Sequence, residues 1–281
     1  MSRLKIVHVT GLRYAEGVTA SYNEARMLPR TREGQFVLSA GLDISPIGAQ
    51  MAYTDYWGAH VVAFEVLTPH DELRVTATSV VDVRPVPQQP LHYTWDELAA
   101  AFPTSLELTD YVAQTPTTEP DDSMRELAQE IRSRGGDVNE TAYEICRAVG
   151  LAMEYRRGVT GVNSTARDAW PKRSGVCQDI AHVALGLLRD AGIPARYVSG
   201  YLHPSREARI GDSVTGESHA WVEWFAGQWH GFDPTNLTEI GDLHVYVGHG
   251  RDYNDVAPLR GVYAGTGGSE LFVSVRLTRL A

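Results

Sequence analysis

The chain has 281 residues, of which 43% are hydrophobic, and it carries a formal net charge of −10 from 25 basic and 35 acidic side chains. This length suits two compact units, and the acidic balance excludes a generic binder of phosphate backbones, so we expect no nucleic-acid partner. The sequence holds no apolar run near the ~20 residues that span a bilayer, and we expect no membrane partner. Only two cysteines occur, which excludes a disulfide scaffold. The low number of cysteines and an N-terminal segment without a signal-peptide pattern together predict a cytoplasmic protein.

Residues 1–84 are predicted to form an N-terminal antiparallel β-sandwich module. The segments 4–10, 35–42, 59–67 and 73–83 are rich in Val, Ile, Phe and Thr and frequently alternate between apolar and polar residues. Residues 85–122 are punctuated by prolines and are interpreted as a connector that packs against both units. Thr94 and Glu97 form a capping-box pattern that predicts one short helix in this connector.

Residues 123–281 are predicted to form a second domain, with helices first and an antiparallel sheet after them, so the expected fold class is α+β. Ser123 and Glu126 suggest a capping box, and a second helix is expected over residues 139–155. A short helix is expected after Ser164 and a fourth from Ser174. After Pro194 the chain alternates between strands and turns.

Cys177 is predicted to lie in the first turn of the fourth helix, as about its third residue, with Ser174 as the N-cap. A helix N-terminus favours a thiolate through its dipole, and the free N–H groups of the first turn can stabilise an oxyanion. The alternative reading is a small buried cysteine. That reading is preferred for Cys146, which falls in the middle of an apolar helical pattern.

His219 and Asp233 are predicted to face each other across a β-hairpin. If residues 225–227 form a three-residue loop with Gly227 in the left-handed conformation, Trp224 pairs with Gln228 and His219 lies directly opposite Asp233. The aspartate then orients the imidazole, whose other nitrogen faces Cys177 provided that the helix packs on the same face of the sheet. Taken singly, each of the two residues is more often structural. A zinc site is the chemical rival, because Cys, His and Asp all bind zinc.

Five segments of the chain resemble those of the bacterial transglutaminase-like proteins: residues 175–182, 188–201, 218–221, 231–236 and 250–258. The similarity covers about residues 140–281, and residues 1–84 resemble the β-rich region that often precedes this domain in the family. The resemblance implies a papain-like fold, in which a helix bearing the cysteine packs against an antiparallel sheet bearing the histidine and the aspartate. It also implies that Cys177 is the nucleophile, His219 the base and Asp233 the orienting acid.

The sequence also suggests roles in the site for four other residues. Trp170 and Gln178 are candidates for a second oxyanion donor, and Tyr201 and Trp221 are candidates for lining a substrate groove. For all four, a structural role in the core is the alternative. We expect no cofactor and no metal.

The resemblance implies an acyl-thioester on Cys177 and leaves the acceptor open, because the superfamily carries out proteolysis, amide hydrolysis, deamidation and acyl transfer to amines. The leading hypothesis is an intracellular thiol hydrolase of a peptide, protein or small amide substrate. A transferase to amines and a non-catalytic binding module are the alternatives. Assembly into a homo-oligomer is also left open.

Overall fold

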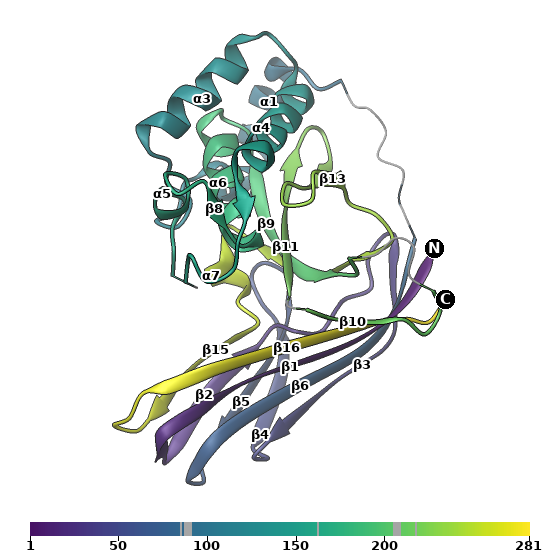
Figure 1. The fold of residues 1–281 in the computed structure, drawn as a ribbon. Helices are drawn as coiled ribbons and strands as arrows, with labels where there is room; N and C mark the ends of the chain where they lie inside the picture. The colour runs from purple at the N-terminus through teal and green to yellow at the C-terminus, as the bar shows by residue number, and fades with distance from the viewer. Residues whose placement is uncertain (85, 87–91, 162, 205–208, 217) are drawn as a thin grey trace.

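The computed structural model describes residues 1–84, 86, 92–161, 163–204, 209–216 and 218–281. Figure 1 shows two lobes, a β-rich lobe that contains both chain ends of the drawn ribbon and a mixed lobe that contains helices and a sheet. None of the helices in the described part of the chain combines the length and the apolar content that crossing a bilayer requires.

Two antiparallel sheets form the β-rich lobe (Figure 1). One has the strand order β10-β16-β1-β6-β3 and the other β15-β2-β5-β4. The strands are β1 (Ser2–Val18), β2 (Ala20–Ala25), β3 (Gln35–Ser45), β4 (Ala49–Thr54), β5 (His60–Val66), β6 (His70–Val83), β10 (Ser213–Gly216), β15 (Leu259–Ala264) and β16 (Ser269–Arg279).

The β-sandwich predicted for the N-terminal residues is confirmed. Along β6 the buried and less buried positions alternate, as expected for a strand with one face in a core. Leu73 and Val75 of this strand pack in one buried cluster with Phe64 and Val66 of β5, which belongs to the other sheet. Burial of these side chains between the sheets removes apolar surface from water and holds the sandwich together.

The last strands of the chain belong to the sandwich, which corrects the expected domain boundary. Strand β16 pairs with β1 from Leu4↔Arg279 to Tyr14↔Ser269, and β15 pairs with β2. The domain expected over residues 123–281 therefore ends before Leu259. The strand pattern of this segment was visible in the sequence, but its partner was not, because antiparallel pairing joins residues more than 200 positions apart.

The connector contains the predicted short helix, α1 (Trp95–Ala101), and the Thr94 capping box with Glu97 is present. Two further short helices follow, the 3₁₀-helix η1 (Phe102–Thr104) and α2 (Leu106–Val112). Pro85, Pro87 and Pro90 lie outside the described residues. The lobes also pack directly, because Leu4, Ile6, Val81 and five other sandwich or sheet residues form one buried cluster with Tyr201 of the mixed lobe.

The mixed lobe has a five-stranded sheet of order β13-β12-β11-β9-β14. Its strands are β9 (Ala195–Leu202), β11 (His219–Phe225), β12 (Trp229–Asp233), β13 (Thr238–Glu239) and β14 (His244–Gly250), and a two-stranded ribbon is made by β7 (Glu154–Tyr155) and β8 (Ser174–Gly175). The helices are α3 (Asp122–Ser133), α4 (Val138–Ala152), α5 (Ala166–Ala169), α6 (Cys177–Asp190) and α7 (Tyr253–Val256). This α+β arrangement agrees with the predicted fold class.

Two helices of this lobe begin at other residues than expected. The N-cap of α3 is Asp121, whose carboxylate accepts the Met124 N–H at 2.9 Å, so the capping box predicted at Ser123 is wrong. Asp137 caps α4 in a capping box with Glu140. Aspartate and serine both make good caps, and only the backbone conformation shows which of two neighbouring residues takes the position.

The β11–β12 hairpin has the predicted loop length but a different register. Phe225 pairs with Trp229 and Trp224 with His230, so the three loop residues are 226–228 instead of 225–227. Gly227 has the predicted positive φ, +81°. Because the register is displaced by two positions, His219 lies diagonally from Asp233 and not directly opposite, yet an even displacement leaves both residues on one face of the sheet.

We predict that Gly227→Val destabilises the protein by at least about 1–2 kcal/mol, the cost of a left-handed backbone for a residue with a side chain. The new Cβ would also lie 3.1 Å from the ring of Tyr93. Gly268→Val is the control, because a Cβ at Gly268 meets nothing within 4 Å. Chemical denaturation of both variants measures the difference, and equal free energies of unfolding would contradict the prediction.

Candidate active site

Cys177 is the first residue of α6 and not the third, which corrects the expected N-cap. Ser174 and Gly175 form strand β8, which pairs in parallel with β7, so Ser174 is extended and Val176 takes the N-cap position. The Asp179 carboxylate reaches back and accepts the Val176 N–H at 2.7 Å. The ribbon thereby sets the point at which the helix begins, and the first N–H groups of a helix have no intrahelical acceptor.

The two cysteines have contrasting surroundings. Cys177 is partly exposed, and its Sγ lies 4.0 Å from the Ser218 carbonyl oxygen, next to His219 in the chain. Cys146 is completely buried in the core around α6, as predicted, and burial raises the pKa of its thiol. A buried neutral thiol is a poor nucleophile, so the structure leaves Cys177 as the accessible one.

His219 and Asp233 form a direct hydrogen bond. Their Nε2 and Oδ2 atoms are 2.7 Å apart, and the two side chains are 11% and 0% exposed. This contact leaves His219 Nδ1 for Cys177, whose thiol is close enough to help raise the pKa of the imidazole. The structure thus brings together all three residues that the sequence predicted.

The helix does not pack on the expected face of the sheet. Ala220, Val222 and Trp224 lie in the core with α6, and residues alternate along a strand, so His219 belongs to the opposite face. Cys177 still reaches His219, because one residue begins α6 and the other begins β11. The contact is therefore made over the end of the strand and not through the face of the sheet.

The electrostatics of the pair favour the imidazolium. Burial alone would lower the pKa of His219, but its hydrogen bonds with Asp233 and Cys177 outweigh burial and raise the pKa to about 10. Burial would likewise raise the pKa of Asp233, but hydrogen bonds from His219 and His244 hold it well below its ordinary value of 3.8. At neutral pH the site therefore holds a charged aspartate beside a protonated histidine.

Asp233 has further partners that the sequence reasoning missed. Its Oδ1 accepts the backbone N–H groups of Thr235 and Asn236 at 3.0 and 3.2 Å, and its Oδ2 also accepts the Asn236 side chain at 2.7 Å. His244 Nε2 lies 3.4 Å from the same Oδ2. Asn236 was detectable as part of the segment 231–236. His244 reaches the site because β14 pairs with β9, and β9 in turn pairs with β11, the strand that carries His219.

The geometry also bears on the zinc alternative. Among the described residues, His219, Asp233 and His244 each offer one atom that could ligate a metal, these atoms lie within 4.8 Å of one another, and Cys177 is not a member of this group. Both imidazoles instead use these atoms for hydrogen bonds to the Asp233 carboxylate. The contacts present are those of a hydrogen-bonded Cys–His–Asp arrangement.

Comparisons with known proteins agree with this geometry. Residues 4–82 match the family model of the bacterial transglutaminase-like N-terminal region, and residues 125–234 match that of the transglutaminase-like superfamily. Protein ML0607 of Mycobacterium leprae is 41% identical over 281 residues and covers 100% of both chains. The chain belongs to the bacterial transglutaminase-like proteins.

One further relative and one solved structure extend the comparison. Protein Rv2569c of Mycobacterium tuberculosis is 33% identical, with 97% of this chain and 91% of that protein covered. The crystal structure of a candidate cysteine protease from Cytophaga hutchinsonii superimposes with a TM-score of 0.79 at 20% identity, covering 100% of this chain and 91% of the other. The structural similarity to that protein therefore extends over the whole chain, with the β-sandwich included.

Within this transglutaminase-like fold, Trp170 is not free to serve as an oxyanion donor. Its indole Nε1 donates to Ser123 Oγ at 2.9 Å, its side chain is 2% exposed, and the Arg173 guanidinium lies 3.5 Å above the ring. The indole thus joins α3 to the segment before α6. Gln178 directly follows Cys177 and is buried, and its role as a donor stays a prediction.

The two groove candidates are core residues in the structure. Tyr201 is 2% exposed in the cluster between the lobes, and its hydroxyl donates to the Met27 carbonyl at 2.8 Å. Trp221 is 1% exposed and packs edge-on against His244, with 5.4 Å between ring centroids. Trp221 thus supports the site from within the protein. The prediction that Tyr201 lines a groove is wrong, because it faces the sandwich.

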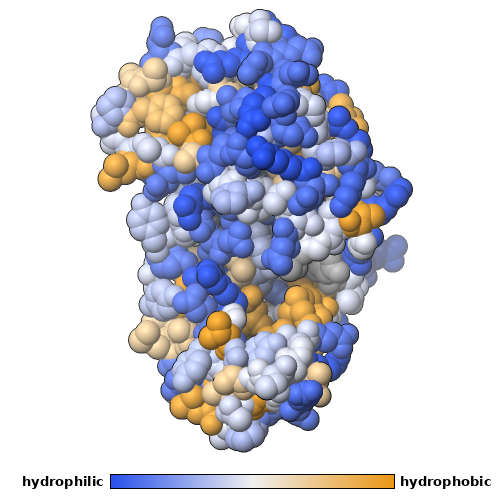
Figure 2. Space-filling model, turned by 90° about the vertical axis from the view of Figure 1, so that its left-hand side faces the viewer, coloured by the Kyte–Doolittle hydropathy of each residue, from blue (hydrophilic) through white to orange (hydrophobic). Residues whose placement is uncertain are grey.

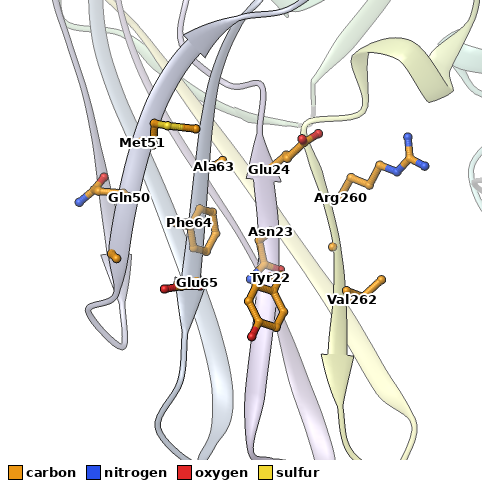
Figure 3. A pocket seen from close by; sticks show the side chains of 12 residues that line it. Tyr22, Asn23, Glu24, Gln50, Met51, Ala63, Phe64, Glu65, Arg260 and Val262 are labelled. Atoms are coloured by element: carbon orange, nitrogen blue, oxygen red, sulfur yellow. The ribbon is translucent and has the colours of Figure 1, made fainter.

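A separate groove of about 760 Å³ crosses the four-stranded sheet of the sandwich. Figure 3 shows the side chains that line it on neighbouring strands, among them Met51 on β4, Tyr22 on β2 and Val262 on β15. These three are 65%, 52% and 69% exposed, and Figure 2 shows apolar residues gathered at this end of the molecule. The groove has no residue in common with the Cys177 site.

We predict that iodoacetamide at pH 7 modifies Cys177 to completion before Cys146 reacts, because Cys146 is completely buried and burial raises its pKa. His219→Ala should slow the labelling of Cys177, since the thiol then loses its proton acceptor. Peptide mass spectrometry after timed labelling measures both sites. Labelling of Cys146 first in the folded protein would contradict the assignment.

Proposed function

We propose that this protein is a cysteine-dependent amide or peptide hydrolase that acts through an acyl-thioester on Cys177. The observation that carries the proposal is the 2.7 Å contact of the His219 imidazole with the buried Asp233 carboxylate, with the Cys177 sulfur 4.0 Å from the carbonyl oxygen of Ser218, the residue before His219. A thiol beside a histidine that accepts its proton becomes a thiolate–imidazolium pair, which is the reactive form of such a nucleophile.

The first half of the proposed reaction breaks the amide bond. The Cys177 sulfur attacks the carbonyl carbon, and the backbone N–H of Cys177, in the first turn of α6, can donate to the oxyanion. As the tetrahedral species collapses, the C–N bond breaks and the imidazolium of His219 donates its proton to the departing amine. The acyl group is then held on Cys177 as a thioester.

The second half restores the enzyme. A water molecule gives a proton to the neutral imidazole of His219 and attacks the thioester carbonyl, and the C–S bond breaks to release a carboxylic acid. Water at ~55 M is the default acceptor unless a site positions an amine better. A transferase that passes the acyl group to an amine uses the same first half, so it is the second candidate.

A purely non-catalytic binding module is less well supported. The buried pairing of His219 with Asp233 costs solvation of both groups, and a scaffold has no use for a partly exposed thiol beside them. The sandwich also contributes to the position of the site, because β10, which precedes His219 in the chain, pairs with β16 of the sandwich.

We also propose that the reaction takes place in the cytoplasm and that its substrate is a peptide, a protein or a small amide. The support for the compartment is the cysteine usage: Cys146 and Cys177 are both free thiols. A reducing compartment keeps thiols in this state. Fractionation of cells, followed by immunodetection of the protein, tests this part of the proposal.

The acceptor is tested by partitioning. A glutamine-containing peptide and a set of peptide amides are incubated with the protein and a labelled primary amine at millimolar concentration, and free acid and amine-coupled product are both quantified. We predict that free acid predominates, because water competes at ~55 M. Predominant amine coupling would make the protein a transferase.

The matched controls for this experiment are two cysteine variants. Cys177→Ala should abolish turnover and the acyl-enzyme seen by intact mass spectrometry. Cys146→Ala removes a thiol of the core and should leave turnover per folded molecule unchanged. Turnover that persists in Cys177→Ala would contradict both the hydrolase and the transferase proposal.

A further inference from the structure

The Asp233 carboxylate receives more hydrogen bonds than a triad requires. Oδ2 lies 2.7 Å from His219 Nε2, 2.7 Å from Asn236 Nδ2 and 3.4 Å from His244 Nε2. Oδ1 accepts two backbone N–H groups. A carboxylate offers about four lone-pair positions, so five donors leave it little freedom to rotate.

The proton of His244 can be assigned from its surroundings. The Gly241 N–H donates to His244 Nδ1 at 3.2 Å, so Nδ1 has to be unprotonated. A neutral imidazole then carries its proton on Nε2, and this is the nitrogen that faces Asp233. His244 is thereby a neutral donor to the same oxygen that holds His219.

The ring of His244 is held in place by packing. Its side chain is 4% exposed, and the Trp221 ring lies edge-on against it at an interplanar angle of 78°. Trp221 also contacts the His219 ring, with 6.2 Å between centroids. His244 is the first residue of β14, where it pairs with Leu202 of β9. Neither its backbone nor its ring can move without disturbing the sheet.

The orientation of Asp233 decides the orientation of His219. Asp233 Oδ2 holds His219 Nε2 at 2.7 Å, which leaves Nδ1 as the ring nitrogen available to the thiol. A displacement of about 1 Å in a reacting group can lower a rate ~10²-fold. A second imidazole on the same oxygen limits the rotation of the carboxylate and so stabilises the productive position of the base.

We propose that His244 is a positioning residue of the Cys177 site, which acts through Asp233 to keep the His219 imidazole directed at the thiol. This inference rests on the proposed function and deepens it. His244 contacts the Asp233 carboxylate, and its ring lies 6.2 Å from the His219 ring and 5.4 Å from the Trp221 ring between centroids, so the proposed effect is on the position of these groups.

The test compares two substitutions of His244 by the rate at which iodoacetamide alkylates Cys177 at pH 7. His244→Phe keeps an aromatic ring against Trp221 and removes the donor. His244→Gln keeps an N–H group at a similar reach. We expect His244→Phe to slow alkylation about tenfold, the size of one lost hydrogen bond to a charged group, and His244→Gln to restore most of the rate.

The matched control is His230→Phe. His230 is also buried in a strand, but it stacks on Trp224, on the face of the sheet that carries α6. We expect its substitution to leave the alkylation rate unchanged. A His244→Phe protein that reacts at the wild-type rate, or Phe and Gln variants that are folded and equally slow, would overturn the positioning role.

Two further measurements keep the outcome decisive. Nitrogen-15 NMR of the wild-type imidazoles should place the His244 proton on Nε2, and a proton on Nδ1 would overturn the proposal even if the Phe variant does not fold. His219→Ala separates the two proposals. If it leaves alkylation unchanged, the proposed function fails, whereas slow His219→Ala with unaffected His244→Phe removes only the role of His244.

Discussion

A fully buried carboxylate organises this site. Asp233 is 0% exposed, and an ionised group in that position is tolerated only when donors replace the water it has lost. The donors come from β11, from β14 and from the turn that follows β12. Because these segments are placed by one sheet, the demand of a single carboxylate for partners links the register of the sheet to the direction of the His219 imidazole.

The sandwich is part of this framework. Strand β16 lies between β1 and β10, and β10 ends at Gly216, shortly before His219 begins β11. The pairing covers an edge of β1 that would otherwise be open to other strands, and it holds the chain that leads into the site. Removal of β16 would therefore disturb the structure of both lobes, although β16 is distant from Cys177 in the sequence.

Much of the site could be predicted because the controlling physics is local. The helix at Cys177 follows from apolar spacing and a stop at Gly192, and the hairpin follows from a glycine that adopts positive φ at Gly227. Only the parity of the hairpin loop was needed to place His219 and Asp233 on one face. The predicted register was wrong by two positions. The loop comprises residues 226–228 and not 225–227, so Phe225 belongs to the strand and pairs with Trp229.

By itself, the sequence determined the family, the order of Cys177, His219 and Asp233, and the fold class, since each depends on residues that are neighbours along the chain. The tertiary structure decided what depends on distant segments. It placed β15 and β16 in the sandwich, it began α6 at Cys177 through the β7–β8 ribbon, and it brought His244 to Asp233 across β9. Backbone hydrogen bonds between strands carry no local signature of their partner, so only the folded chain reveals which strands they join.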